Sequence, residues 1–376
     1  MNRHTRPMFP VGSPVGPEDV VDREDYISQA KARLADGKHL CVIGPRRTGK
    51  TTIINEVLRQ LQERGLLVAS VDLFKVASVR ELAESYANAC LKNESGLDRT
   101  IRALQDLAGQ VSPRLKYRVE QAEIELALAL TRRDADAHTL LSQALDLGEA
   151  VAVRRGKRLV VALDEFQDVS KLDGNELLKR MRAHFQQHAH VSYVFLGSQQ
   201  SWMREIFGQQ QNQPFYRFAL DFPLPEVPRA AWIDYICRKF GQRGINVTEE
   251  LADLLLGYSG GHPMDTMLLC SELYFALMEL GATEPTPTLA RVANERCMAL
   301  LSRVFDESWQ TLGTRKNAQF VAKRLAHGEP LYASSKMPVE TFRALKHLLR
   351  AGVIERVRPG EYRFIEPMFA EYVRRL

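Results

Sequence analysis

Apolar and polar positions along the first 225 residues alternate in blocks that predict strands and helices in turn. Five short apolar runs have the length and composition of buried strands, at residues 40–43, 66–73, 159–163, 191–196 and 218–224. Segments of helical period lie among them, at residues 25–36, 52–62, 175–187 and 201–207. Strands that alternate with helices predict an α/β fold with a parallel sheet.

Residues 78–153 interrupt this alternation with helical segments only. Their apolar positions predict helices at residues 79–91, 98–107, 113–130 and 134–153. We interpret them as a helical insertion between two strands of the sheet, whose apolar stripe needs a packing partner. Basic residues follow at 154–158. Their positive charge can complement the C-terminal end of the preceding helix, which a glycine then stops. Contact with nucleic acid is the alternative, and we favour the helix end.

The second half of the chain is mainly helical. After Pro225 and Pro228, four helices are predicted at residues 229–242, 248–258, 263–280 and 289–305. The remainder predicts a helix at 316–326, a short helix near 331–335, a helix at 338–350 and strands at 353–358 and 361–365, which is the order of a winged helix-turn-helix. The predicted domains are an extended arm (1–17), a P-loop core (18–225), a helical lid (226–302) and a winged helix (303–376).

The first strand leads into a segment from Gly44 to Thr51 that fits the pattern G-x-x-x-x-G-K-[ST]. Backbone N–H groups of such a loop surround a β-phosphate, and the next helix directs its positive end at this anion. Lys50 is placed to reach the β- and γ-phosphates, and the Thr51 hydroxyl to bind Mg²⁺. The predicted nucleotide-binding residues are Gly44, Pro45, Arg46, Arg47, Thr48, Gly49, Lys50, Thr51 and Thr52.

Two adjacent carboxylates, Asp164 and Glu165, follow the apolar strand at 159–163. Ligands of open α/β sheets bind at this carboxyl edge. We therefore expect Asp164 to hold Mg²⁺ through water alongside Thr51. Glu165 is expected to orient and deprotonate the water that attacks the γ-phosphate. An acidic residue that only caps the next helix is the alternative.

Three further positions have both a chemical and a structural explanation. Ser198 or Gln199, after the fourth strand, can hydrogen-bond the γ-phosphate or the attacking water, but Ser198 can equally cap the next helix. Arg217 fits an arginine finger, supplied in cis or by a neighbour, as well as it fits a surface or stacking arginine. His262 precedes Pro263, so we expect it at a helix N-terminus facing the cleft, with a loop histidine of no role as the alternative.

Composition narrows the class of protein. The 376 residues include five well-separated cysteines without a C-x-x-C pair, which argues against a disulfide frame or a zinc site. No apolar run approaches the roughly 20 residues that span a bilayer. The first 17 residues lack an apolar signal core, so we expect a cytoplasmic protein with no membrane partner.

The net charge of +5 is concentrated near the end of the chain, since residues 303–376 hold 14 basic and 8 acidic residues. The third helix of a DNA-binding winged helix enters the major groove and the wing meets phosphate. Candidates for contact with double-stranded DNA are Arg343, Lys346, Arg350, Arg356 and Arg358, with His347 and Arg363 beside them. A packing module with a solvated basic face is the alternative.

Together with residues 21–24, 214–217, 260–263 and 362–369, these motifs resemble the archaeal-type P-loop ATPases of the STAND/AAA+ group, which are related to origin-recognition initiators. The resemblance extends from about residue 18 onward. It implies an ASCE fold with Asp164 and Glu165 as the Walker B pair. It also implies adenine contacts near Val21 and Arg23, and a nucleotide-sensing role for the loop that contains His262 and Pro263.

These features predict a Mg-dependent ATPase that acts as a molecular switch, slow, stimulated by a partner and oligomeric when ATP is bound. ATP would draw the lid onto the P-loop core through His262, which would reposition the winged helix and the insertion toward DNA or a protein partner. One alternative is an initiator- or transposition-type module that ATP holds on duplex DNA, with incidental hydrolysis. Another is a nucleotide-held scaffold that does not hydrolyse ATP.

Overall fold

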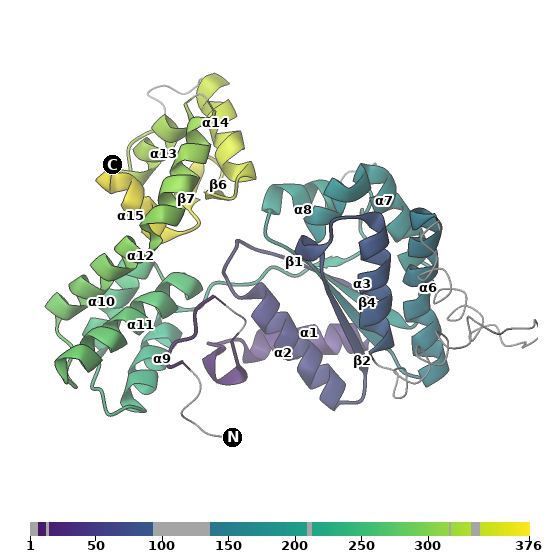
Figure 1. Ribbon diagram of the computed structural model, residues 1–376, viewed down its shortest axis with the longest axis horizontal. Coiled ribbons are helices and arrows are strands. Elements are labelled where there is room, and N and C mark those ends of the chain that lie inside the picture. The colour runs from purple at the N-terminus through teal and green to yellow at the C-terminus, as the bar shows by residue number, and fades with distance from the viewer. Residues whose placement is uncertain (1–6, 13–14, 93–135, 209–212, 316, 332–338) are drawn as a thin grey trace, which may run out of the picture. The chain divides into compact units, whose positions relative to one another are not determined.

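The chain forms two compact units (Figure 1). The computed structural model describes residues 7–12, 15–92, 136–208, 213–315, 317–331 and 339–376. The sheet unit contains Glu24–Gly44 and Ile53–Leu224, and the helical unit contains the described parts of Met1–Arg23, Pro45–Thr52 and Pro225–Leu376. The residues of the P-loop after Gly44 therefore belong to the helical unit, whereas the strand before them belongs to the sheet unit.

The sheet unit is built on five parallel strands in the order β2-β3-β4-β1-β5. The strands are β1 (Leu40–Ile43), β2 (Leu67–Asp72), β3 (Leu159–Asp164), β4 (Val191–Gly197) and β5 (Leu220–Asp221). Every residue of β4 is buried, as a central parallel strand with helices on both faces requires. The predicted α/β fold with a parallel sheet is confirmed.

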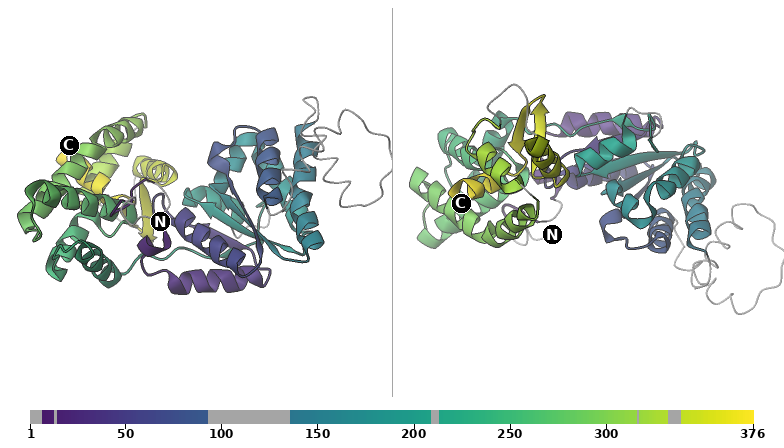
Figure 2. Two further views of the ribbon diagram at one scale, coloured as in Figure 1. Left: turned by 60° about the horizontal axis from the view of Figure 1, so that its bottom comes forward. Right: turned by 90° about the horizontal axis from the view of Figure 1, so that it is seen from above.

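Helices cover both faces of the sheet (Figures 1 and 2). α1 (Glu24–Ala35) and α2 (Lys50–Glu63) lie on one face. α3 (Val79–Leu91), α6 (Ala137–Arg155) and α7 (Ser170–Phe185) share the hydrophobic core of the other face. α3 and α6 are the described ends of the predicted insertion, so both ends form part of the layer that covers the sheet. The helices predicted at 98–107 and 113–130 lie outside the described residues.

Local chemistry explains the bounds of two helices and one strand. α6 has Arg154 and Arg155 in its last turn and Gly156 at φ 58° after it, which confirms the helix-end interpretation of this basic segment. α7 begins before the predicted residue 175 and contains a break at Gly174, which has φ 58°. β5 is much shorter than the strand predicted at 218–224, because the prolines at 223 and 225 cannot donate to a ladder.

From residue 225 onward, the helical unit contains seven α-helices and one hairpin within the described ranges. They are α9 (Arg229–Gly241), α10 (Glu249–Ser259), α11 (Pro263–Leu280), α12 (Pro287–Gly313), α13 (Ala318–Ala326), α14 (Val339–Arg350), β6 (Ile354–Arg358), β7 (Glu361–Phe364) and α15 (Pro367–Arg375). The order of α13, α14 and the antiparallel β6–β7 pair is the one expected of a winged helix. The short helix predicted near 331–335 falls mostly outside the described residues, and α15 was not predicted.

One hydrophobic core runs through the helical unit from α9 to α15. The boundary predicted between residues 302 and 303 falls inside α12, which continues for 27 residues because no proline or glycine interrupts it before Gly313. The segments predicted as the lid and the winged helix therefore share a continuous helix and a continuous core.

The predicted N-terminal arm is anchored in this core. Met8 and Phe9 are buried, and the Phe9 ring lies 4.9 Å from that of Phe240 between centroids. Further along, the buried carboxylate of Asp19 accepts hydrogen bonds from the Tyr235 hydroxyl and from Lys239. The segment thus contributes apolar and polar contacts to α9, 220 residues away in sequence.

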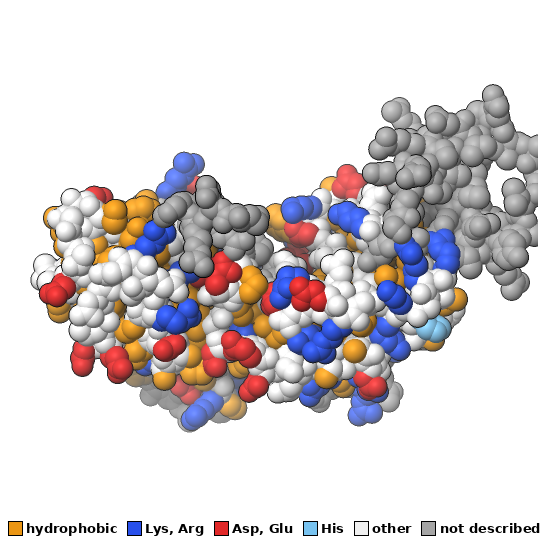
Figure 3. Space-filling view, turned by 90° about the horizontal axis from the view of Figure 1, so that it is seen from below, with side chains coloured by type: hydrophobic (Ala, Val, Ile, Leu, Met, Phe, Trp, Pro, Cys, Tyr) orange, Lys and Arg blue, Asp and Glu red, His pale blue; other side chains and the backbone are white. Residues whose placement is uncertain are grey.

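Charge is mixed on the surface drawn in Figure 3. On this face, both units carry Lys and Arg as well as Asp and Glu side chains. Within the described ranges, every helix is too short or too polar to cross a bilayer.

Candidate nucleotide site

The P-loop is closed on its own backbone in the helical unit. Thr48 Oγ1 donates to the carbonyl oxygen of Pro45 at 2.9 Å, and the Lys50 ammonium donates to the same oxygen. Gly49 has φ 90°, which a side chain would strain, and Arg47 adopts φ 64° despite its side chain. Lys50 is only 5% exposed. Its ammonium therefore lies inside the loop, where a phosphate can replace the carbonyl as its acceptor.

His262 stands immediately before α11, as predicted, and contacts the P-loop. Its Nε2 lies 3.4 Å from the carbonyl oxygen of Arg46, and Pro263 is the first residue of the helix. Nδ1 accepts the backbone N–H of Asp265 at 3.5 Å and lies 3.4 Å from the Asp265 carboxylate. A neutral ring with an unprotonated Nδ1 can accept the Asp265 N–H. A protonated ring would instead donate from Nδ1 to the Asp265 carboxylate.

The electrostatic surroundings of His262 shift its pKa upward. Burial lowers the pKa of this imidazole, but the hydrogen bond with Asp265, together with the charges of Asp265 and Glu366, raises it by more, so the net shift is upward. The adjoining Gly261 carbonyl accepts a hydrogen bond from Trp232 Nε1 at 3.0 Å. The loop before α11 is thus held both by its charged neighbours and by the buried indole.

The segment predicted to meet adenine packs where the predicted lid begins. Arg23 is 4% exposed and donates to the carbonyl oxygens of Pro225 at 2.7 Å and Glu226 at 3.5 Å. Val21 is partly buried against the helical core. The backbone N–H of Val15 donates to Thr52 Oγ1 at 3.4 Å, a contact with the first turn of α2 that no sequence pattern indicated.

A second contact with the P-loop comes from the end of the chain. Arg47 forms an ion pair with Glu366 at 3.0 Å, and Glu366 directly precedes α15. In the first turn of α15, the Met368 N–H donates to Asp265 Oδ2 at 3.4 Å. The residue before α15 therefore contacts the P-loop, and the first turn of α15 contacts the residue that faces His262.

In the sheet unit, the predicted carboxylates lie at the edge from which the P-loop departs. The Gly44 N–H donates to the carbonyl oxygen of Gly197 at 3.3 Å, which brings the end of β1 beside the end of β4. β3 lies on the other side of β4 and ends at Asp164, whose Oδ1 accepts the Glu165 N–H at 2.9 Å. Strand order thus gathers Gly44, Asp164, Glu165 and Ser198 at one edge.

Glu165 has strained backbone and well-defined side-chain contacts. Its φ is 51°, an uncommon value for a residue with a side chain. Its Oε2 accepts a hydrogen bond from Ser198 Oγ at 2.6 Å and another from Gln167 Nε2. The helix-cap explanation of Ser198 is wrong, because α8 (Gln200–Phe207) has Gln199 at its N-cap with no side-chain hydrogen bond. The partnership of Gln167 with Glu165 was not predicted.

Arg217 is exposed in the sheet unit, and its φ is 52°. Its guanidinium carbon lies 5.3 Å from the centroid of the Tyr216 ring, within cation–π range. This contact gives the stacking explanation a geometric basis, while the arginine finger stays a prediction.

The donor set suits Mg²⁺ in part. The Thr51 hydroxyl and the Asp164 carboxylate are oxygen donors of the kind that this ion prefers. Within the described residues there is no group of three or more His, Cys, Asp or Glu that could hold a metal. A Mg²⁺ ion bound by either of these groups would take most of its ligands from phosphate oxygens and water, as Mg²⁺ commonly does in nucleotide sites.

The candidate DNA-binding side chains lie mainly on the surface of α14 and β6. Arg343, Lys346, Arg350, Arg356 and Arg358 are exposed. Arg363 is exposed on β7 but engages acidic partners, Glu355 at 2.7 Å and also Glu226. His347 is turned partly inward, and burial lowers its pKa. Six of the seven candidates are thus exposed, on α14, β6 and β7.

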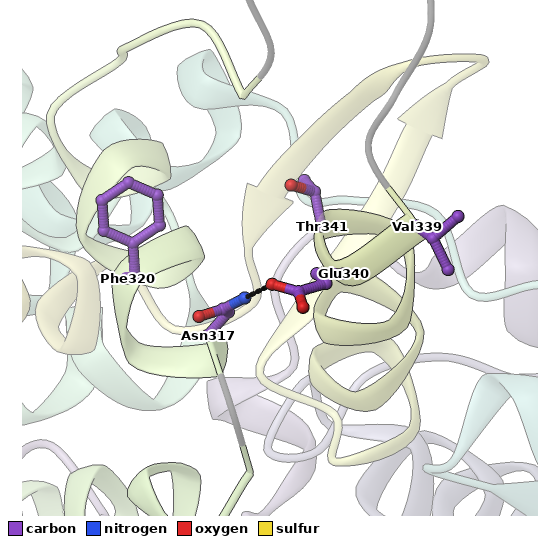
Figure 4. A pocket seen from close by; sticks show the side chains of 5 residues that line it. All are labelled: Asn317, Phe320, Val339, Glu340 and Thr341. Atoms are coloured by element: carbon purple, nitrogen blue, oxygen red, sulfur yellow. Dashed lines mark hydrogen bonds between the residues drawn. The ribbon is translucent and has the colours of Figure 1, made fainter.

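A hollow adjoins the first turn of α14 (Figure 4). Phe320 and Val339, both largely exposed, line it together with Thr341. Asn317 Nδ2 donates to Glu340 Oε2 at 2.7 Å across it. The negative charge of the Glu340 carboxylate would repel a phosphate group, so the hollow does not extend the basic surface.

Comparisons with known proteins agree with this architecture. The profile of one family, described as ATPase domains predominantly from Archaea, matches residues 20–215. An uncharacterised ATP-binding protein of Pyrococcus horikoshii is 25% identical over 250 residues, which cover 64% of this chain and 71% of the relative.

Two solved structures share the fold. A Walker-type ATPase of Pyrococcus abyssi has a TM-score of 0.70 at 17% identity, covering 98% of this chain and 99% of its own. The ORC2 protein of Aeropyrum pernix, in ADPNP and ADP complexes, has a TM-score of 0.60 at 15% identity, covering 97% and 95%. At these identities the likeness establishes the fold alone.

Proposed function

The chain belongs to the family of ATPase domains that occur predominantly in Archaea, and we propose that it binds ATP with Mg²⁺ and hydrolyses it as a molecular switch. The observation that carries the proposal is Glu165, with its strained backbone and its hydrogen bond from Ser198, at the strand edge that also holds Gly44 and Asp164. ATP-binding relatives and the P-loop pattern support the choice of nucleotide.

Each residue has a distinct task in this proposal. The P-loop N–H groups and Lys50 bind the β- and γ-phosphates, in exchange for the contacts within the loop. Glu165 accepts a proton from the attacking water, and Ser198 keeps that carboxylate in place. Thr51 and Asp164 would hold Mg²⁺, which supplies neutralisation of phosphate charge. Arg217 is a candidate for completing the site in a homo-oligomer.

The contacts of the P-loop support a switch. His262 joins the loop to α11, and Glu366 joins it to the start of α15. Both contacts are made by residues between Gly44 and Gly49. A phosphate bound in the loop would therefore either compete with these contacts or reinforce them. The bound nucleotide would thereby bias the winged-helix segment toward or away from duplex DNA, or toward a protein partner of the insertion.

ATP turnover by wild type and by Glu165→Gln, each with and without duplex DNA, tests the proposal. Loss of a general base reduces rates by about 10²- to 10⁴-fold. We expect turnover by wild type, stimulation by DNA, and a loss of that order in the variant. Turnover at a rate that does not change with DNA would support the proposed ATPase activity and reject DNA as the partner. No turnover under any condition would reject hydrolysis.

A second candidate is a module that ATP holds on duplex DNA while hydrolysis is incidental. The exposed basic side chains of α14 and β6 favour it. Under this alternative, Glu165→Gln would bind DNA at least as tightly as wild type in the presence of ATP. Under the switch, the same variant would bind DNA but fail to release it.

A further inference from the structure

We propose that Gln167 is a positioning residue for Glu165, and that it directs Glu165 Oε1 to the attacking water. This inference rests on the proposed ATP hydrolysis and adds a residue to the same site. It concerns the sheet unit only.

The hydrogen bonds of Glu165 distinguish its two carboxylate oxygens. Oε2 accepts a hydrogen bond from Ser198 Oγ at 2.6 Å and another from Gln167 Nε2. A carboxylate oxygen has two lone-pair directions in its plane, so two donors occupy Oε2. Oε1 accepts no hydrogen bond from the residues that the structure describes. The carboxylate is partly exposed, so water can reach this oxygen.

Burial of Gln167 argues that its amide is retained for this contact. The residue is 2% exposed, and its Oε1 has no hydrogen-bond partner within the described part of the chain. Leaving a buried acceptor unpaired costs about 1–3 kcal/mol. An apolar side chain of similar size would avoid that cost and fill the same space. An apolar replacement would, however, lack the amide nitrogen that donates a hydrogen bond to Glu165.

The turn that carries both residues is fixed independently of this hydrogen bond. Phe166 is fully buried, and its ring packs against Phe195 and Phe215 at centroid distances of 4.7 and 5.2 Å. The Asp168 N–H donates to the Glu165 carbonyl at 2.8 Å, and Ser170 Oγ donates to the Gln167 carbonyl at 2.7 Å. Removal of the Gln167 amide should therefore release the Glu165 side chain while the backbone of the turn stays in place.

The chemical step then has a defined direction. A water molecule gives a proton to Glu165 Oε1 as its oxygen forms a bond to the γ-phosphorus. The bond from that phosphorus to the bridging oxygen of the β-phosphate breaks, and ADP leaves with the electron pair. Gln167 and Ser198 take no proton. They restrain the rotation of the carboxylate so that Oε1 meets the water.

Steady-state ATP turnover of the full chain tests this role in wild type, Gln167→Leu and the control Ser170→Ala. Misplacement of a reacting group by about 1 Å costs about 10²-fold in rate. We expect kcat of Gln167→Leu to fall by about 10- to 100-fold with little change in KM. Ser170→Ala loosens the same turn without touching the Glu165 carboxylate, so its kcat should stay near that of wild type.

Two further variants separate positioning from a general loss of structure. In a Glu165→Gln background, Gln167→Leu should cause no additional loss, because the carboxylate through which it acts is absent. Gln167→Glu keeps the size of the side chain and provides the answer if Gln167→Leu does not fold. Because a carboxylate has no hydrogen to donate to Glu165 Oε2, kcat of this variant should fall as it does in Gln167→Leu.

Unchanged or increased kcat in Gln167→Leu would overturn the inference and leave the proposed ATPase intact. An equal loss in Ser170→Ala, or a further loss in the Glu165→Gln background, would also overturn it, because the effect would then come from the fold of the turn. Absence of turnover in wild type would reject the proposed hydrolysis and this inference together.

Discussion

Phe9→Ala should destabilise the helical unit strongly, although residue 9 lies more than 200 residues before the helix whose rings it contacts, α9. The Phe9 side chain is 3% exposed and meets the rings of Phe240 and Tyr235. Burial of about 150–250 Å² by an aromatic side chain corresponds to about 4–6 kcal/mol at about 25 cal/mol per Å². Because Ala keeps the Cβ and the cavity partly collapses, we expect a loss of about 3–5 kcal/mol.

Equilibrium unfolding in urea, followed by circular dichroism, measures this loss. Phe74→Ala is the matched control, since Phe74 is 70% exposed in the sheet unit and its removal should change stability by less than about 0.5 kcal/mol. A loss below about 1 kcal/mol for Phe9→Ala would refute the reasoning, because it would mean that the first residues do not fill the core next to α9.

Three other predictions concern charges. Glu366→Gln removes the ion pair with Arg47, and because both side chains are partly exposed we expect a loss of less than about 1 kcal/mol in urea unfolding. A larger loss would show that the pair is more buried than its exposure indicates. Burial raises the pKa of Asp146, but hydrogen bonds from two histidine rings lower it by more, so the net shift is downward. This group then contributes stability above its unfolded pKa of about 3.9, which is lost as the pH falls through the lower folded value, and Asp146→Asn should flatten this acid dependence of the urea midpoint. Arg343→Ala should weaken duplex binding and make its dependence on salt less steep by about one unit of the log–log slope, measured by titration at several salt concentrations. Equal slopes for variant and wild type would indicate that this arginine does not meet phosphate.

Features set by neighbouring residues could be predicted from the sequence. Strand β1 and the glycines of the P-loop follow from a short apolar run and a fixed spacing, and the structure has the strand at the predicted residues. The carboxylates after β3 follow from the rule that parallel strands present their carboxyl ends at one edge. Helix α11 begins at Pro263, as its proline and the preceding glycines indicated.

Features that depend on distant partners could not be predicted. Arg47 and Glu366 are 319 residues apart, and no periodicity relates them. Arg23 carried an expected role toward adenine, yet its guanidinium reaches the Pro225 carbonyl 202 residues away. Gln167 lies only two residues from Glu165, but Glu165 has a positive φ, which is uncommon for a residue with a side chain and cannot be predicted from its type.

The hydrogen bond from Trp232 to Gly261 gives the protein a built-in optical probe. The indole is 1% exposed and is joined to the residue next to His262, so its emission should respond when that loop changes its contacts with the P-loop. Trp202 is 41% exposed in the sheet unit, and its redder emission provides an internal reference. Rapid mixing with nucleotide would then time the response of the loop before α11 without any attached dye, and Trp232→Phe would remove the signal.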